Sequence, residues 1–100
     1  MYHERVQLAH TMADGYIIPL GMVNLVSVVT GNGMVGCGAF DINALDAFSY
    51  PAARAGRVDG GLMVTIDDLL TGIIKGVNEA ARKRGVVIGM SGKEALELLS

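Results

Sequence analysis

Residues 23–30 and 31–36 read VNLVSVVT and GNGMVG, and the fold depends on what the second stretch does. An apolar strand followed by GxGxxG is typical of dinucleotide-binding loops, whose glycines bring a helix start against a pyrophosphate. A helix here is unfavourable, because Gly36 and Gly38 would lie inside it at a cost of about 1 kcal/mol each relative to alanine. Apolar segments joined by Asn-Gly favour a β-hairpin with a type I′ turn. We therefore expect a hairpin, with dinucleotide binding between Gly31 and Gly36 as an alternative.

The two faces of this hairpin differ if Asn32 and Gly33 are its turn residues. Cys37 then lies opposite Val28, on a face that carries apolar side chains. The other face lacks side chains at Gly36 and Gly38. Missing side chains allow a helix, a partner subunit or a ligand to approach the backbone closely.

Hydrophobic alternation predicts a strand over residues 4–12, and apolar runs predict extended segments over 16–20 and 22–29. Residues 53–58 are a further strand candidate. A turn is expected at Asp14 and Gly15, and a break at Pro19 and Gly21. Residues 73–77 fit either a strand or the entry to a helix, and 86–88 are expected to be extended.

Helix start signals lie at Asp41, at Thr65 and at the sequence SGKE, in which Ser91 and Glu94 form a capping box. Residues 78–84 are also expected to be helical, because three basic residues precede Gly85. These patterns predict one α+β domain over residues 1–100. It has a mainly antiparallel sheet in the first half and three or four short helices, mostly in the second.

Composition points to self-association in the cytoplasm. Hydrophobic residues make up 51% of the chain and glycine another 14 residues, more apolar surface than one small monomer hides. We therefore expect a homo-oligomer. A net charge of −2 without a basic stripe argues against nucleic acid, and no apolar stretch is long enough to cross a membrane. A lone cysteine and no signal peptide favour the cytoplasm.

Cys37 and Asp41 are candidate site residues with simpler structural roles. A nucleophilic thiol needs a nearby cation or helix N-terminus, whereas a free cysteine is most often a small buried side chain. Asp41 could act as a general base or bind a ligand, but an N-cap role already explains it.

Two further segments could bind an anion. GMSGKE at 89–94 lacks the full phosphate-loop pattern, yet free amides near Ser91 and Gly92 could hold an anion with help from Lys93. A plain capping box is the alternative. In RAGR, Arg54 and Arg57 suggest either anion binding or a solvated strand edge. His3 and His10 would lie on opposite faces of one strand, so no metal site is predicted.

The segments GMVGCGAFD, RVDGGLMVTIDDLL and GVVIGMSGKEALELL, preceded by IPLGMVNLVSVV, resemble the YunC-like family of small uncharacterised bacterial and archaeal proteins. The resemblance covers the chain from about Asp14 to Leu99. It implies an α+β domain of unknown function and no established substrate, cofactor or catalytic residue. Its signature positions correspond to Cys37, Gly38, Asp41, Arg57, Ser91 and Gly92.

The leading hypothesis is a homo-oligomeric domain that binds a small anionic molecule or assembles with a partner, without catalysis or a cofactor. The site residues assigned to it are Cys37, Asp41, Arg57, Ser91 and Gly92. The alternative is an enzyme that uses Cys37 as nucleophile with Asp41 and Arg57 as polar helpers.

Overall fold

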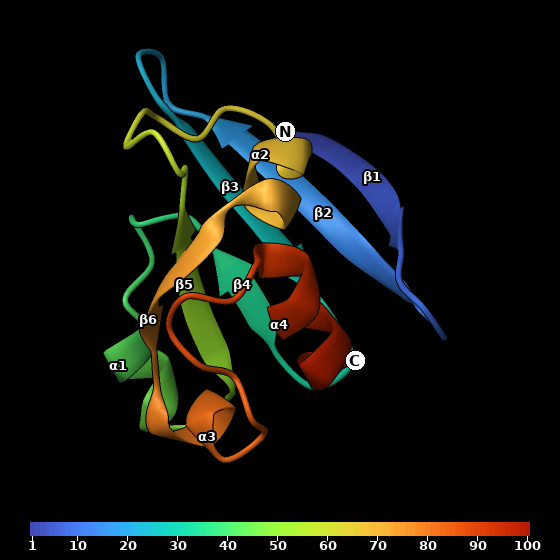
Figure 1. The fold of residues 1–100 in the computed structure, drawn as a ribbon. Coiled ribbons are helices and arrows are strands. Elements are labelled where there is room, and N and C mark those ends of the chain that lie inside the picture. Colours follow the sequence, from blue (N-terminus) through green and yellow to red (C-terminus); the bar gives the residue numbers. More distant parts are fainter.

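A computed structural model describes residues 1–100 and shows a six-stranded sheet in the order β1-β2-β3-β4-β5-β6 (Figure 1). The strands are β1 (Tyr2–Gln7), β2 (Met12–Pro19), β3 (Asn24–Val29), β4 (Met34–Gly36), β5 (Ala52–Gly56) and β6 (Ile73–Val77). Neighbouring strands are antiparallel, except that β4 and β5 are parallel. The predicted α+β class is confirmed, although the sheet continues into the second half of the chain.

Four short helices complete the domain: α1 (Ile42–Asp46), α2 (Ile66–Thr71), α3 (Glu79–Arg82) and α4 (Gly92–Leu99). Asp41, Thr65 and Ser91 cap α1, α2 and α4 as predicted, each accepting a hydrogen bond from the amide three residues later. These caps form because a short oxygen-bearing side chain satisfies amides that have no partner inside the helix. None of the helices has the length and hydrophobicity needed to cross a membrane.

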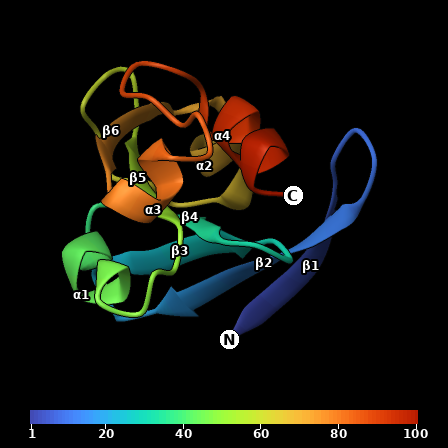
Figure 2. The same cartoon turned by 90° about the horizontal axis from the view of Figure 1, so that it is seen from below.

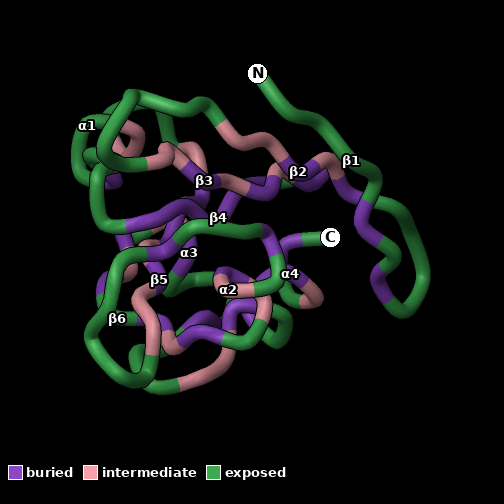
Figure 3. The backbone as a smooth tube through the Cα atoms, turned by 90° about the horizontal axis from the view of Figure 1, so that it is seen from above, coloured by how far each residue is buried: buried purple, intermediate pink, exposed green.

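The helices are divided between the two faces of the sheet. Figure 2 shows α2 and α4 on one face, whereas α1 lies on the other. The main core of 18 buried residues joins α2 and α4 to the sheet, and a smaller core of Met34, Ile42 and Ala52 lies under α1. Figure 3 shows the buried segments gathered where β3, β4 and β5 meet α4.

The predicted hairpin is formed by β3 and β4, but its turn was predicted one residue too late. The Thr30 amide donates to the Gly33 carbonyl, so Gly31 and Asn32 are the turn residues, and Val28 lies opposite Val35 instead of Cys37. The Thr30 hydroxyl accepts from the Gly33 amide at 3.1 Å and lies 2.7 Å from the Leu99 carbonyl. This side chain fixes the turn, and no residue in it needs a positive φ.

Other differences from the prediction arise from packing between distant segments. Residues 4–12 do not form one strand, because β1 ends at Gln7. Asp14 and Gly15 lie inside β2 rather than in a turn. Gly15 is small because Ile66 of α2 packs on it: a Cβ there would lie 2.5 Å from Ile66 Cδ1. Residues 86–88 lie outside the sheet.

The side chain of Asn78, the N-cap of α3, is buried and makes four hydrogen bonds. Its Nδ2 donates to the carbonyls of Ile42 at 3.0 Å and Tyr50 at 2.8 Å. Its Oδ1 accepts from the amides of Ala52 at 3.1 Å and Ala81 at 2.9 Å. One carboxamide thus ties together α1, the start of β5 and the start of α3.

Replacing Asn78 with alanine should destabilise the protein by about 2–4 kcal/mol, because several buried backbone groups would lose their partners. The measurement is urea unfolding of Asn78→Ala beside Asn43→Ala, which alters an exposed asparagine of α1. The control should remain within about 0.5 kcal/mol of wild type. Equal losses in the two variants would show that the buried network contributes little.

Candidate functional site

A cavity of about 490 Å³ lies where β4 and β5 separate. The two parallel strands pair only from Met34 to Gly36 and from Ala52 to Arg54. Beyond these pairs the two strands diverge. The loop before β3 and the segment between β5 and α2, which lie at the same end of the sheet, complete the walls of the cavity (Figure 1). The lining residues are Val23, Asn24, Cys37, Gly38, Ala39, Arg54, Ala55, Gly56, Gly61, Leu62, Met63 and Lys75.

The charged side chains of this cavity are all cationic. Arg54 and Lys75 line it, and no aspartate or glutamate does. Neither cation takes part in an ion pair within the chain. The Nε of Arg54 is buried without a hydrogen-bond partner. A buried donor of this kind costs free energy, so its presence needs an explanation.

The sequence of β5 and β6 places both cations here. Arg54 pairs with Gly76 of β6, and its guanidinium lies over that glycine: a Cβ there would be 2.6 Å from an Nη of Arg54. The register then shifts, so that Ala55 pairs with Ile74 and Lys75 is the extra residue of a β-bulge. In an unbroken register Lys75 would lie opposite the buried Ala55. Because of the bulge, Ile74 lies opposite Ala55 and packs in the core, and the Lys75 side chain extends to the cavity.

Cys37 was interpreted from the sequence either as a site residue or as a small buried side chain, and its position has features of both. It is 6% exposed and belongs to the main core, which agrees with a small buried side chain. It also lines the cavity that holds Arg54 and Lys75. Its backbone amide donates to Val26, so the strand pairing of the hairpin fixes its position.

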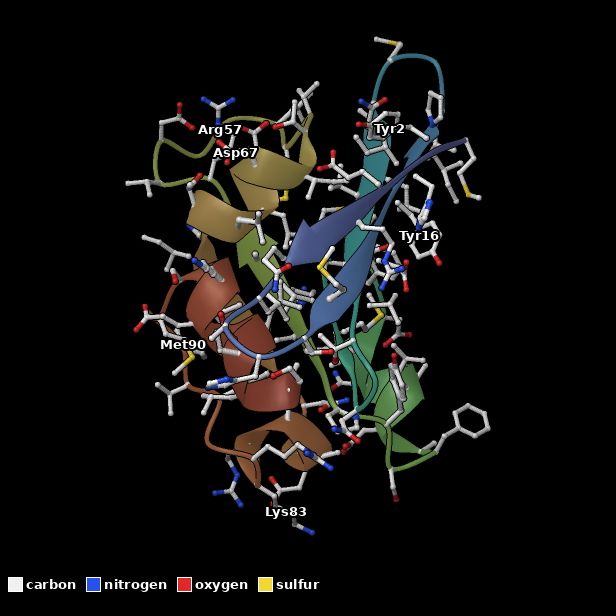
Figure 4. All side chains as sticks on the ribbon, turned by 90° about the vertical axis from the view of Figure 1, so that its right-hand side faces the viewer. Tyr2, Tyr16, Arg57, Asp67, Lys83 and Met90 are labelled. Atoms are coloured by element: carbon white, nitrogen blue, oxygen red, sulfur yellow. The ribbon has the colours of Figure 1, made fainter.

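Asp41 and Arg57 do not line this cavity. Asp41 accepts from the Ala44 amide at 3.0 Å as the cap of α1. Arg57 pairs with Asp59 through two hydrogen bonds of 3.1 and 2.8 Å on the exposed loop after β5. Figure 4 shows Arg57 at the upper end of the molecule in that view. The structure therefore does not assemble the set of Cys37, Asp41 and Arg57.

Ser91 and Gly92 lie at the start of α4, and neither lines the cavity. The Gly92 amide donates to the Gly72 carbonyl at 3.0 Å, and the Ser91 amide donates to the Glu94 carboxylate at 3.0 Å. Two amides that could have bound an anion are thus already paired. A Cβ on Gly92 would collide with the Leu69 carbonyl, so glycine is required for α4 to approach α2.

Gly31 to Gly36 do not form a dinucleotide-binding loop. These residues make the hairpin turn and β4, and no helix starts directly after them. Gly36 instead accommodates the ring of Phe40, which a Cβ would overlap. No three His, Cys, Asp or Glu side chains gather as metal ligands.

Sequence reasoning considered Arg54 for anion binding but did not select it, and it missed Lys75 and Asn24. The lysine next to a glycine in the apolar strand IIKGV could have indicated that Lys75 leaves the core at this point. Such a pair inside a buried strand is typical of a bulge or of a close backbone approach.

The fold and the cavity define a class of small α+β domain with a cationic site at the diverging ends of two parallel strands. The chain belongs to the family described as "Domain of unknown function (DUF1805)", which matches residues 36–99. It is 36% identical over 80 residues to the uncharacterized protein YunC of Bacillus subtilis (strain 168), covering 79% of this chain and 77% of that protein. The predicted YunC-like relationship is confirmed.

The fold also resembles the crystal structure of a protein of unknown function, TA1206 from Thermoplasma acidophilum. The TM-score is 0.87 at 18% sequence identity, with 99% of this chain and 92% of that chain covered. At this identity the similarity establishes the shared fold.

The capping box of α2 makes stability depend on pH. The Asp68 carboxylate accepts hydrogen bonds from the amides of Val64 at 2.9 Å and Thr65 at 3.0 Å, which lower the pKa of this carboxyl. A lowered folded-state pKa stabilises the protein above the ordinary pKa of about 4, and the contribution is lost as pH falls through the folded-state pKa. Asp68→Asn should therefore be less stable than wild type at neutral pH.

The difference should shrink as pH falls below about 4, when the wild-type carboxylate also becomes protonated. Urea unfolding across this range measures it. Asp67→Asn is the matched control, because no hydrogen bond to the Asp67 side chain is present in the same helical turn. A difference between wild type and Asp68→Asn that does not change with pH would argue against this role for the carboxylate.

Proposed function

We propose that this domain binds a small anionic molecule in the cavity between β4 and β5, without catalysis of its own. The observation that carries the proposal is that Arg54 and Lys75 both line the cavity while neither has an ion-pair partner within the chain. Two cations at one cavity repel each other, and a bound anion would offset this repulsion.

The charge and shape of the cavity favour an anion. Arg54 and Lys75 supply two positive charges with no carboxylate beside them. A guanidinium binds carboxylate or phosphate through two parallel hydrogen bonds, and a nearby ammonium adds a point charge. Gly38 also lines the cavity, and nothing lies within 4 Å of the position that its Cβ would take, so a ligand can approach the backbone closely there.

The proposal assigns no reaction to the cavity. The enzyme hypothesis needs Asp41 and Arg57 beside Cys37, and both lie outside the cavity. Cys37 instead offers a probe of occupancy, because a bound molecule should slow alkylation of a thiol that lines the same space.

Arg54→Met should abolish stabilisation by anions without destabilising the free protein. Methionine retains much of the apolar stem but removes the unpaired donor, so the free variant should equal wild type or exceed it by up to about 2 kcal/mol. Thermal unfolding with and without inorganic phosphate measures both effects, since a ligand raises stability in proportion to its occupancy of the folded state.

Arg57→Met is the matched control, because Arg57 is three residues away but paired with Asp59 outside the cavity. It should keep the wild-type response to phosphate. Equal responses in the Arg54 and Arg57 variants would contradict the assignment of the site.

We also propose that the domain self-associates in the cytoplasm. Support comes from large apolar side chains outside the cavity that remain exposed in the isolated chain, among them Leu20, Met22, Phe48 and Ile88. Contiguous exposed apolar surface commonly marks an interface between proteins. Cys37 is a free cysteine, which fits a reducing compartment.

Native mass spectrometry of protein purified gently from cells should show an oligomer, because self-association would remove this apolar surface from water. The same spectrum reports any retained small molecule as added mass. A monomer at all micromolar concentrations would contradict self-association and leave the anion site to be judged by the Arg54 variant.

A further inference from the structure

The cavity has two chemically different walls. Arg54 and Lys75 come from the adjacent strands β5 and β6. The loops contribute apolar side chains: Val23 precedes β3, and Leu62 and Met63 belong to the segment between β5 and α2. The polar and apolar surfaces therefore come from different parts of the fold.

The apolar wall is partly open to water. Val23 is 43% exposed and Leu62 is 65% exposed, although both line the cavity, whereas Met63 is buried at 8%. A ligand that covers Val23 and Leu62 gains from removing their surface from water. A bare inorganic anion at the cationic wall has no chain with which to cover them.

The two loops that make the apolar wall are joined to each other. Asn24 Nδ2 donates to the Val64 carbonyl at 3.1 Å, which links the start of β3 to the segment before α2. The Asp59 carboxylate accepts from the Gly61 amide at 2.9 Å and holds the turn that precedes Leu62. Because these bonds form in the free protein, ligand binding needs little ordering of the wall.

We infer that the ligand is an amphipathic anion: an acidic group, carboxylate or phosphate, attached to an apolar chain. This inference rests on the proposed function. The acidic group binds Arg54 and Lys75, and the chain covers Val23, Leu62 and Met63. A neutral apolar molecule would leave Arg54 and Lys75 without an opposite charge, and a bare anion would leave the apolar wall exposed. A cavity of about 490 Å³ accommodates a molecule of this kind.

The test is calorimetric titration with acetate, butyrate, hexanoate and octanoate, together with hexyl phosphate, inorganic phosphate and hexanol. Affinity should rise about two- to fourfold per methylene while the chain remains on the wall. Hexanol should bind much more weakly than hexanoate. Comparison of hexanoate with hexyl phosphate identifies the preferred acidic group.

Two variants at exposed positions test where the apolar chain of the ligand binds. Leu62→Ser should reduce the dependence on chain length and leave acetate binding unchanged. Val87→Ser, an equally simple change outside the cavity, should bind the whole series like wild type.

The outcomes separate this inference from the proposed function. If acetate and inorganic phosphate bind as tightly as octanoate and lose affinity in Arg54→Met, the anion site stands and the amphipathic ligand is overturned. The same conclusion follows if Leu62→Ser keeps the full chain-length dependence. If hexanol binds as tightly as hexanoate and Arg54→Met has no effect, the anion site itself is overturned.

Discussion

The buried carboxamide of Asn78 is the constraint on which the second half of the fold depends. It satisfies two carbonyls from α1 and the chain after it, and two amides at the starts of β5 and α3. All its hydrogen-bonding groups are used, which is the condition under which a buried polar side chain fixes one arrangement. Since β5 begins at the bonded Ala52, this network also holds the strand that carries Arg54.

The Asn78 network is connected to the cavity through the pairing of β5 with β6. Gly76 gives space for the Arg54 guanidinium, and the bulge lets Ile74 fill the core while Lys75 leaves it. Two positive charges are thus held close to an apolar interior without an acidic partner. These are the two groups to which the proposed anionic ligand would bind.

Local features of this fold were predictable from sequence, and features set by distant contacts were not. The caps at Asp41, Thr65 and Ser91 depend on residues three positions apart, so a short sequence window contains their cause. The hairpin turn lies one residue earlier than predicted, because the Thr30 hydroxyl accepts from the Gly33 amide. The same hydroxyl donates to the Leu99 carbonyl, a contact that no local turn preference reveals. Asp14 and Gly15 were predicted as a turn because both residue types are common in turns. In the structure Gly15 lies in β2, where Ile66 of α2 packs on it, and a local sequence pattern does not reveal that contact.

The candidate site was the least predictable part for the same reason. Cys37, predicted from the sequence as a ligand-binding residue, lines the cavity, but Arg54 and Lys75 come together only through the strand pairing and its bulge. Asp41, Ser91 and Gly92 attracted attention because caps and ligand sites share residue types. In the structure, capping and close packing account for all three.

The two edges of the sheet differ in a way that limits how copies of this chain can assemble. The loop before α4 covers the outer edge of β6, because Ile74 exchanges hydrogen bonds with Gly89 and Met90. The other edge, β1, is open but carries His3, Glu4 and Arg5 as exposed polar side chains. Charged edge strands resist pairing with another sheet. Growth into a continuous intermolecular sheet is therefore disfavoured, and the proposed self-association would have to use side-chain surfaces, which can close into a finite particle.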